Sequence, residues 1–217
     1  MTADRGMLED VLGRDSYSFF SVDSQHSAFS EESLVEFCAT AEGLGIPVIF
    51  RIKHTRQSYL VGNLLDLGPT GAEVPQVEEV ETVEESVAYF YYPQQGKRSW
   101  GGAARWGVKA RPGRLEYAEW WNSTGVLWMQ VESIEAITNM RKLIKPGIDC
   151  FSWGPMDLSF NRESQPDHPF KTDDDCLRYA LQQLKGTDVT LCYRNFEPAL
   201  RDKYIQMGVT LLLEPPK

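Results

Sequence analysis

Short runs of β-branched and aromatic residues alternate along the chain with longer segments whose apolar residues recur every three to four positions. The short runs are typical of buried strands, and the longer segments are typical of helices that pack one face against a sheet. We expect strands at residues 17–22, 48–52, 71–75, 126–132, 149–153, 189–193 and 209–213. We expect helices between them at residues 31–44, 59–66, 80–91, 134–143, 174–184 and 198–207. This alternation predicts βα units around a parallel sheet.

One long segment, residues 93–113, follows neither pattern and is rich in glycine, arginine and tryptophan. Long irregular segments in compact domains usually serve a function. We therefore expect it to lie over the mouth of an active site. Trp100, Arg98 and Arg105 are its candidate contacts to an acidic substrate, with simple packing as the alternative.

Composition limits the partners. The chain has 217 residues, which suits one domain over residues 1–217, and its formal charge is −9. Because no basic surface is available for phosphate groups, nucleic acid and anionic membranes are excluded as main partners. No apolar run approaches the ~20 residues of a spanning helix. Four scattered cysteines and the absence of a leader predict a reduced, cytoplasmic protein.

Polar residues follow several of the expected strands at the point where each strand ends. In a parallel βα arrangement the reactive groups collect at these carboxyl ends. The residues concerned are Asp23, His26, Arg51, Gln130, Glu132 and Asp157. The sequence thus predicts two carboxylates, a histidine beside an aspartate, and an arginine on one rim.

The chemistry of these side chains suggests roles. Glu132 and Asp157 carry the oxygen ligands that Mg²⁺ or Mn²⁺ prefers. The guanidinium of Arg51 is suited to hold a carboxylate or to stabilise an enolate oxygen. His26, three residues after Asp23, is a candidate general base oriented by that aspartate. Each residue alone has a structural explanation, but their coincidence at four strand ends favours metal-assisted enolate chemistry.

Several short motifs contain these residues or lie between them. They are Val22-Asp23-x-x-His26, Arg51, Leu64-Leu65-Asp66-x-Gly68-x-x-Gly71 with Val74-Pro75, Tyr92-Pro93-x-x-Gly96-x-Arg98, Gln130-Val131-Glu132, Gly147-Ile148-Asp149 and Gly154-Pro155-x-Asp157-Leu158-Ser159. In order and approximate spacing, residues 8–169 resemble the HpcH/HpaI aldolase and citrate-lyase-like family, the metal-dependent class II pyruvate aldolases. The glutamine–glutamate motif and the Gly-Pro-x-Asp-Leu-Ser motif are the specific ones.

The resemblance implies a TIM-type barrel and a site that binds a 2-keto acid. Glu132 and Asp157 then look like the ligands of a divalent cation, Mg²⁺, Mn²⁺ or Co²⁺. Arg51 looks like the residue that holds the keto oxygen, and His26, oriented by Asp23, like the acid–base. Further residues implied at the site are Gln130 and Met156, beside the substrate carboxylate, and Asp66, which in the family reaches into a neighbouring subunit. A homo-oligomer is therefore implied.

The sequence departs from the family pattern at three places. Gln25 stands where the family has a glutamate, and Met156 stands where it has a small residue. The first strand and the last helix of the family barrel are not evident, so we expect a shortened barrel. Exposed strand edges invite aggregation, so another subunit or the chain termini are expected to cover them.

The leading functional prediction is a divalent-metal-dependent lyase that forms or uses a pyruvate enolate to cleave or make a carbon–carbon bond of a 2-keto-4-hydroxy acid. One alternative is an oxaloacetate decarboxylase whose enolate is captured by another electrophile, as in macrophomate-synthase-like relatives. The other alternative is a non-catalytic helper subunit that retains the binding residues.

Overall fold

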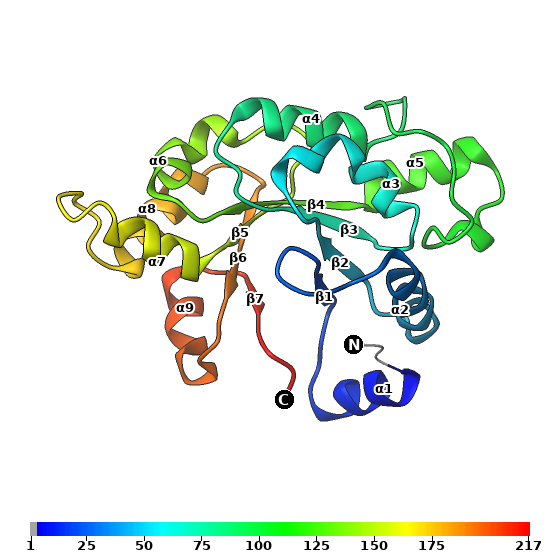
Figure 1. Ribbon diagram of the computed structural model, residues 1–217, viewed down its shortest axis with the longest axis horizontal. Helices are drawn as coiled ribbons and strands as arrows, with labels where there is room; N and C mark the ends of the chain where they lie inside the picture. The colour runs from blue at the N-terminus through cyan, green and yellow to red at the C-terminus, as the bar shows by residue number, and fades with distance from the viewer. Residues whose placement is uncertain (1–3) are drawn as a thin grey trace.

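The computed structural model describes residues 4–217 and contains one parallel sheet of seven strands (Figure 1). The strands are β1 (Phe20–Asp23), β2 (Val48–Arg51), β3 (Gly71–Val74), β4 (Val126–Val131), β5 (Cys150–Trp153), β6 (Thr190–Arg194) and β7 (Leu211–Leu213). They are paired in the order of the sequence. Residues of β1, β4 and β7 line the same cavity, so the sheet curls into a nearly closed barrel. The expected TIM-type α/β fold and all seven expected strands are confirmed.

Helices surround this sheet, and no helix of residues 4–217 is long and apolar enough to cross a membrane. They are α1 (Arg5–Arg14), α2 (Glu31–Leu44), α3 (Val61–Leu65), α4 (Val80–Phe90), α5 (Arg114–Thr124), α6 (Ile134–Leu143), α7 (Pro155–Glu163), α8 (Asp173–Leu184) and α9 (Arg201–Met207), with 3₁₀ turns η1 (Thr55–Leu60), η2 (Val108–Ala110) and η3 (Pro198–Leu200). The sequence pattern missed α1, α5 and α7. In α5, charged and aromatic residues alternate without a continuous apolar stripe, so its period is hidden.

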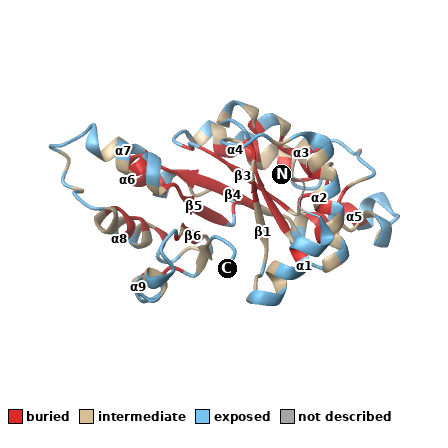
Figure 2. Ribbon diagram, turned by 60° about the horizontal axis from the view of Figure 1, so that its bottom comes forward, coloured by how far each residue is buried: buried red, intermediate tan, exposed pale blue. Residues whose placement is uncertain are grey.

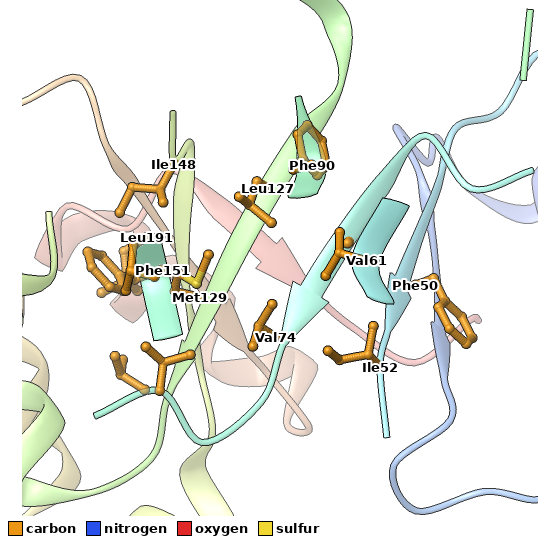
Figure 3. Close-up of a cluster of buried hydrophobic side chains, with 14 of the residues drawn as sticks. Phe50, Ile52, Val61, Val74, Phe90, Leu127, Met129, Ile148, Phe151 and Leu191 are labelled. Atoms are coloured by element: carbon orange, nitrogen blue, oxygen red, sulfur yellow. The ribbon is translucent and has the colours of Figure 1, made fainter. Parts of the chain in front are cut away.

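The main hydrophobic core lies between the outer surface of the barrel and the helices. Figure 2 shows buried residues concentrated on the strands and on the helix faces next to them. Phe50, Leu127 and Phe151 of the strands belong to this core together with Val61 and Phe90 of the helices. Figure 3 shows Leu127 beside Phe90, and Phe151 beside Leu191. The alternate residues of the same strands point into the barrel, because successive side chains of a strand lie on opposite faces.

The barrel interior contains an apolar layer of side chains and, next to it, a polar layer. Ile49, Trp128, Cys150 and Cys192 form a small buried cluster inside it. Two residues further along the same strands, toward their carboxyl ends, the inward positions are held by Arg51, Gln130, Ser152 and Arg194. Because every second side chain of a strand points inward, these residues form a polar layer at the carboxyl ends of the strands, next to the apolar layer.

The barrel remains open between β1 and β7, since no described strand pairs with the outer edge of either. The C-terminal segment lies beside the connection between α1 and β1 at this opening (Figure 1). The backbone N–H of Lys217 donates a hydrogen bond of 2.9 Å to the Tyr17 hydroxyl, and its ammonium group pairs with Asp15 at 2.5 Å. These contacts join the C-terminus to the segment before β1, but a cavity lined by residues of both segments still lies between β1 and β7. Covering of the two strand edges, by the termini or by a second subunit, stays a prediction.

The expectation that residues 93–113 cover the active-site mouth is wrong. This segment follows α4, which runs back from the carboxyl ends of the strands to their amino ends. There Trp106 lines a cavity with Pro47, Thr70 and Gly125, residues that immediately precede β2, β3 and β4. None of residues 93–113 lines the cavity at the carboxyl ends. Its arginines pack on aromatic rings, for example Arg105 over Trp100 at 3.9 Å.

Candidate active site

A cavity of about 380 Å³ opens at the carboxyl ends of the strands. Seven of the eight candidate residues from the sequence line it: Asp23, His26, Arg51, Gln130, Glu132, Met156 and Asp157. They come from β1, β2, β4 and the start of α7, and from the loops that follow these strands. The fold therefore brings together groups that are more than 130 positions apart in the sequence.

Arg51 is fixed by hydrogen bonds from all three of its guanidinium nitrogens. Nε and Nη2 donate to the carboxylate of Asp23 at 2.8 and 2.5 Å, and Nη1 donates to Oε1 of Gln130 at 3.1 Å. Burial alone would raise the pKa of Asp23, but the hydrogen bonds and charge of Arg51 outweigh it and hold this pKa below its ordinary value. The pair is therefore ionised and rigidly placed at the rim.

Asp23 is engaged differently from the sequence expectation. Its carboxylate accepts the two Arg51 hydrogen bonds and a 2.8 Å bond from the backbone N–H of Gln25. His26 is exposed in the bend after β1, and no hydrogen bond from its imidazole to Asp23 is among those of residues 4–217. Because the carboxylate of Asp23 is bound by the guanidinium of Arg51, it does not orient the imidazole of His26. Asp23 thus shapes the backbone of the loop that carries His26.

Glu132 is a buried carboxylate whose two oxygens have no hydrogen-bond partner. The residue directly follows β4 and is 6% exposed. Burial and then the nearby charge of Asp157 raise the pKa of Glu132 to about 8, against a smaller opposing effect of Arg51. An unpartnered buried carboxylate is costly. A cation bound beside Glu132 would offset this cost.

Gly154 explains how the carboxylate of Glu132 fits. A Cβ atom at Gly154 would lie 2.4 Å from Oε2 and 2.6 Å from Cβ of Glu132, closer than atoms in contact can come. Glycine at the start of the Gly-Pro-x-Asp motif is therefore required for Glu132 to point into the cavity beside Asp157.

The donor set fits a hard divalent cation. Among residues 4–217 no cluster of three or more histidine, cysteine or acidic side chains is arranged to hold a metal ion. Glu132 and Asp157 form a pair instead, with one carboxylate buried and unsatisfied and the other exposed in the first turn of α7. Mg²⁺ is often bound by only one or two carboxylates, and keeps water or substrate oxygens at its other positions.

The start of α7 adds backbone donors to the same cavity. Gly154 and Pro155 begin the helix, and Met156, which is 73% exposed, and Asp157 follow in its first turn. The first N–H groups of a helix have no partner within it and attract anions. This end of α7 is suited to a substrate carboxylate close to the pair of acids.

Asp66, the eighth candidate, lies outside the cavity. It follows α3 and precedes β3, which places it at the amino ends of the strands. Its carboxylate accepts a 2.8 Å hydrogen bond from Arg98, whose side chain is wholly buried between the rings of Tyr92 and Trp121. Burial raises the pKa of Asp66 despite Arg98. Within one chain Asp66 does not reach the other candidates, and its role in a neighbouring subunit stays a prediction.

Sequence reasoning missed three polar residues inside the barrel. Glu73 of β3 is fully buried and bonds to Ser152 of β5 and to Arg194 of β6. Arg194 also lines the cavity. Each stands in an otherwise apolar strand, so the runs looked like plain core. The signal was their alternation along the strands. Glu73 is in register with Arg51 and Ser152 with Gln130, and Arg194 lies two residues after the inward-facing Cys192.

Comparisons with known proteins identify the family of the chain. A family model described as HpcH/HpaI aldolase/citrate lyase matches residues 32–184. The 2-dehydro-3,6-dideoxy-6-sulfogluconate aldolase of Pseudomonas putida is 27% identical over 203 residues, which cover 92% of this chain and 77% of that protein. The hydroxypyruvate/pyruvate aldolase of Pseudomonas aeruginosa is 26% identical over 207 residues, with 92% and 74% covered. The match to the hydroxypyruvate/pyruvate aldolase of Roseobacter denitrificans spans only 58% of that protein.

Solved structures show the same fold. The HpcH/HpaI aldolase from Desulfitobacterium hafniense DCB-2 superimposes with a TM-score of 0.83 at 23% identity, covering 99% of this chain and 82% of that one. Macrophomate synthase gives a TM-score of 0.79 at 20% identity, with 95% and 74% covered. The expected enzyme class, a carbon–carbon lyase, is confirmed at the level of relatives that are named aldolases. With the family model covering well over half of its length, this chain belongs to the HpcH/HpaI aldolase/citrate lyase family.

Proposed function

We propose that the protein is a divalent-metal-dependent lyase of the class II pyruvate aldolase type. It forms or uses a pyruvate enolate to cleave or make a carbon–carbon bond of a 2-keto-4-hydroxy acid. The observation that carries this proposal is Glu132, a buried carboxylate without a partner, in one cavity with Asp157 and Arg51. Family membership supports it.

The keto acid binds along the floor of the cavity. Its carboxylate accepts hydrogen bonds from the first N–H groups of α7, at Met156 and Asp157, next to the amide of Gln130. Arg51 donates to the keto oxygen, and its two bonds to Asp23 keep the guanidinium in place. Glu132 and Asp157 would hold the divalent cation, Mg²⁺ or Mn²⁺, and a bound cation would supply Lewis-acid polarisation of the keto group.

In the cleavage direction His26 takes the proton of the 4-hydroxyl group. The C3–C4 bond breaks, C4 becomes the carbonyl carbon of an aldehyde or ketone, and the electron pair of the broken bond passes to C3 and the keto oxygen. Arg51 stabilises the negative charge that develops on this oxygen only as the bond breaks. The enolate then takes a proton at C3 and leaves as pyruvate. Synthesis follows the same steps in reverse.

One observation favours the second candidate, decarboxylation of oxaloacetate with capture of the enolate. His26 is exposed, and the carboxylate expected to orient it is held by Arg51. Decarboxylation needs Arg51 and the cation, but it does not require His26 to remove a proton from a 4-hydroxyl group. If His26→Ala loses aldol cleavage and keeps decarboxylation, the aldolase assignment of His26 holds. If aldol cleavage survives as well, the role given to His26 is wrong.

Hydrogen–deuterium exchange at the methyl group of pyruvate tests the function common to both candidates. The wild-type protein with Mg²⁺ or Mn²⁺ should exchange the methyl protons, and Glu132→Gln should abolish the exchange. Glu135→Gln removes a nearby exposed acid on α6 and serves as the matched control that keeps it. Absence of exchange in the wild type with either metal would contradict the proposal and favour the helper subunit.

A further inference from the structure

The cavity at the amino ends of the strands is a second hollow of the barrel, and the proposed reaction does not use it. Its volume of about 340 Å³ lies within the roughly 300–1,000 Å³ that is typical of small-molecule sites. Aromatic side chains form much of its wall: Phe19, Trp106, Trp120, Trp121 and Trp128. Because layers of side chains usually fill the interior of a (β/α)₈ barrel, the unfilled space leaves room for a ligand.

The gap between β1 and β7 gives a small molecule access to this cavity. Ser18, Phe19 and Leu211 line both this cavity and the neighbouring one between the two strands. The two cavities therefore adjoin, and no described strand fills the space between β1 and β7. A small molecule can reach the aromatic wall from the open side of the barrel.

A single carboxylate stands in this largely apolar wall. Among residues 4–217, Asp149 is the one charged residue that lines the cavity. It directly precedes β5, and its Oδ2 accepts a 2.7 Å hydrogen bond from the backbone N–H of Leu127. No hydrogen bond to its Oδ1 is among those of the described residues. Oδ1 is therefore an acceptor that the cavity offers to a ligand.

Nearby charges limit the charge that a ligand of this cavity can carry. The guanidinium of Arg111 lies 4.0 Å from the centre of the Trp120 ring, and that of Arg98 lies 4.4 Å from the centre of the Trp121 ring. Because these two rings already bind cations, a cationic ligand would gain little from them. An anion would meet the carboxylate of Asp149 in apolar surroundings. The cavity therefore suits a neutral aromatic ring with one hydrogen-bond donor.

We propose that this cavity binds a neutral aromatic molecule of the indole class. Its ring packs offset or edge-to-face against the tryptophans, and its N–H donates a hydrogen bond to Oδ1 of Asp149. The inference does not rest on the proposed function, because none of the described residues lines both this cavity and the cavity at the carboxyl ends.

Calorimetric titration with indole and with benzofuran tests this assignment. The two molecules share one bicyclic shape, but benzofuran has a ring oxygen in place of the N–H donor. The wild-type protein should bind indole about tenfold or more tightly, because only indole makes the hydrogen bond to the carboxylate. An excess of pyruvate with Mg²⁺ should leave the affinity for indole unchanged, since the two cavities are separate.

Asp149→Asn tests the acceptor with almost no change of shape. The backbone N–H of Leu127 needs an oxygen, so the new amide should turn its oxygen to Leu127 and its NH₂ group to the cavity. This variant should lose the preference for indole and still bind benzofuran. Asp188→Asn is the matched control, because Asp188 is an exposed acid that precedes β6 and does not line the cavity. It should keep the wild-type preference.

Leu211→Phe tests the place of binding and keeps the test decisive if Asp149→Asn fails to fold. Leu211 lines the cavity, and a larger side chain there takes up part of the space. Both probes should lose affinity for this variant. An unchanged affinity for both would overturn the inference.

Three further results would overturn it. They are failure of both probes to bind the wild type, equal affinities of the wild type for the two probes, and a preference for indole that persists in Asp149→Asn. Displacement of indole by pyruvate would place indole at the carboxyl ends and would contradict the inference as well. Methyl-proton exchange, which tests the proposed function, is measured without either probe, so each proposal can fail alone.

Discussion

The two ends of the barrel contain cavities of similar size and opposite chemistry. The cavity at the carboxyl ends, about 380 Å³, is lined by Asp23, Arg51, Glu132 and Arg194. The cavity at the amino ends, about 340 Å³, is lined mainly by apolar side chains, among them Trp106 and Trp128. Only two residues of strand separate the two layers, Trp128 from Gln130. The apolar end stabilises the folded barrel. The polar end contains buried polar atoms without hydrogen-bond partners, such as the two oxygens of Glu132, which a ligand can pair.

Trp128→Ala at the apolar end should have the largest effect on folding. Trp128 is 3% exposed and packs edge-on against Phe19 at 5.3 Å and against Cys150 and Cys192. Removal of a buried tryptophan side chain costs about 3–5 kcal/mol of unfolding free energy. Urea denaturation measures the loss, and the Mn²⁺ affinity of the folded variant should stay unchanged. A large loss of metal affinity would mean that the two ends are not independent.

Glu132→Gln at the polar end should instead stabilise the metal-free protein at high pH. Burial and Asp157 raise the pKa of Glu132 to about 8 from an ordinary value of 4.5. A raised carboxyl pKa favours the folded state below pH 4.5, and this contribution is lost as the pH rises toward 8. In EDTA at pH 9 the variant should exceed the wild type by up to about 5 kcal/mol, and at pH 4 the two should agree. A variant less stable than the wild type at pH 9 would contradict the burial cost.

Arg51→Lys should lower catalysis with a small effect on folding. Lysine keeps the charge but not the fork that binds Asp23 and Gln130 together. Loss of one aligned donor to a developing oxyanion typically costs about a hundredfold in rate, or about 2.7 kcal/mol. The rate of methyl-proton exchange at saturating pyruvate measures this. A rate within twofold of the wild type would remove Arg51 from the enolate step.

The positions of the strands and most of the candidate site residues could be predicted from the alternation of apolar runs and polar residues along the chain. Buried parallel strands read as apolar runs, and Glu132 and Asp157 stand where such runs end. Arg194 and Glu73 were missed because a single polar residue inside an apolar run does not change the pattern of the run, and only the folded barrel shows that the two side chains meet in a hydrogen bond. The sequence prediction put residues 93–113 at the wrong end of the barrel. The segment follows α4, which runs from the carboxyl ends of the strands to their amino ends, so the segment begins at the amino ends. The role of Asp66, the homo-oligomer and the cytoplasmic location stay predictions.

Binding of Mn²⁺, followed by electron paramagnetic resonance of the free ion, tests the central claim that the polar end is a cation site built on Glu132 and Asp157. The account predicts that the wild type removes free Mn²⁺ from solution, that Glu132→Gln and Asp157→Asn each weaken this strongly, and that Glu135→Gln does not. Affinity in the wild type should rise with pH up to about 8, as Glu132 loses its proton. Equal Mn²⁺ binding by the wild type and Glu132→Gln would contradict the account.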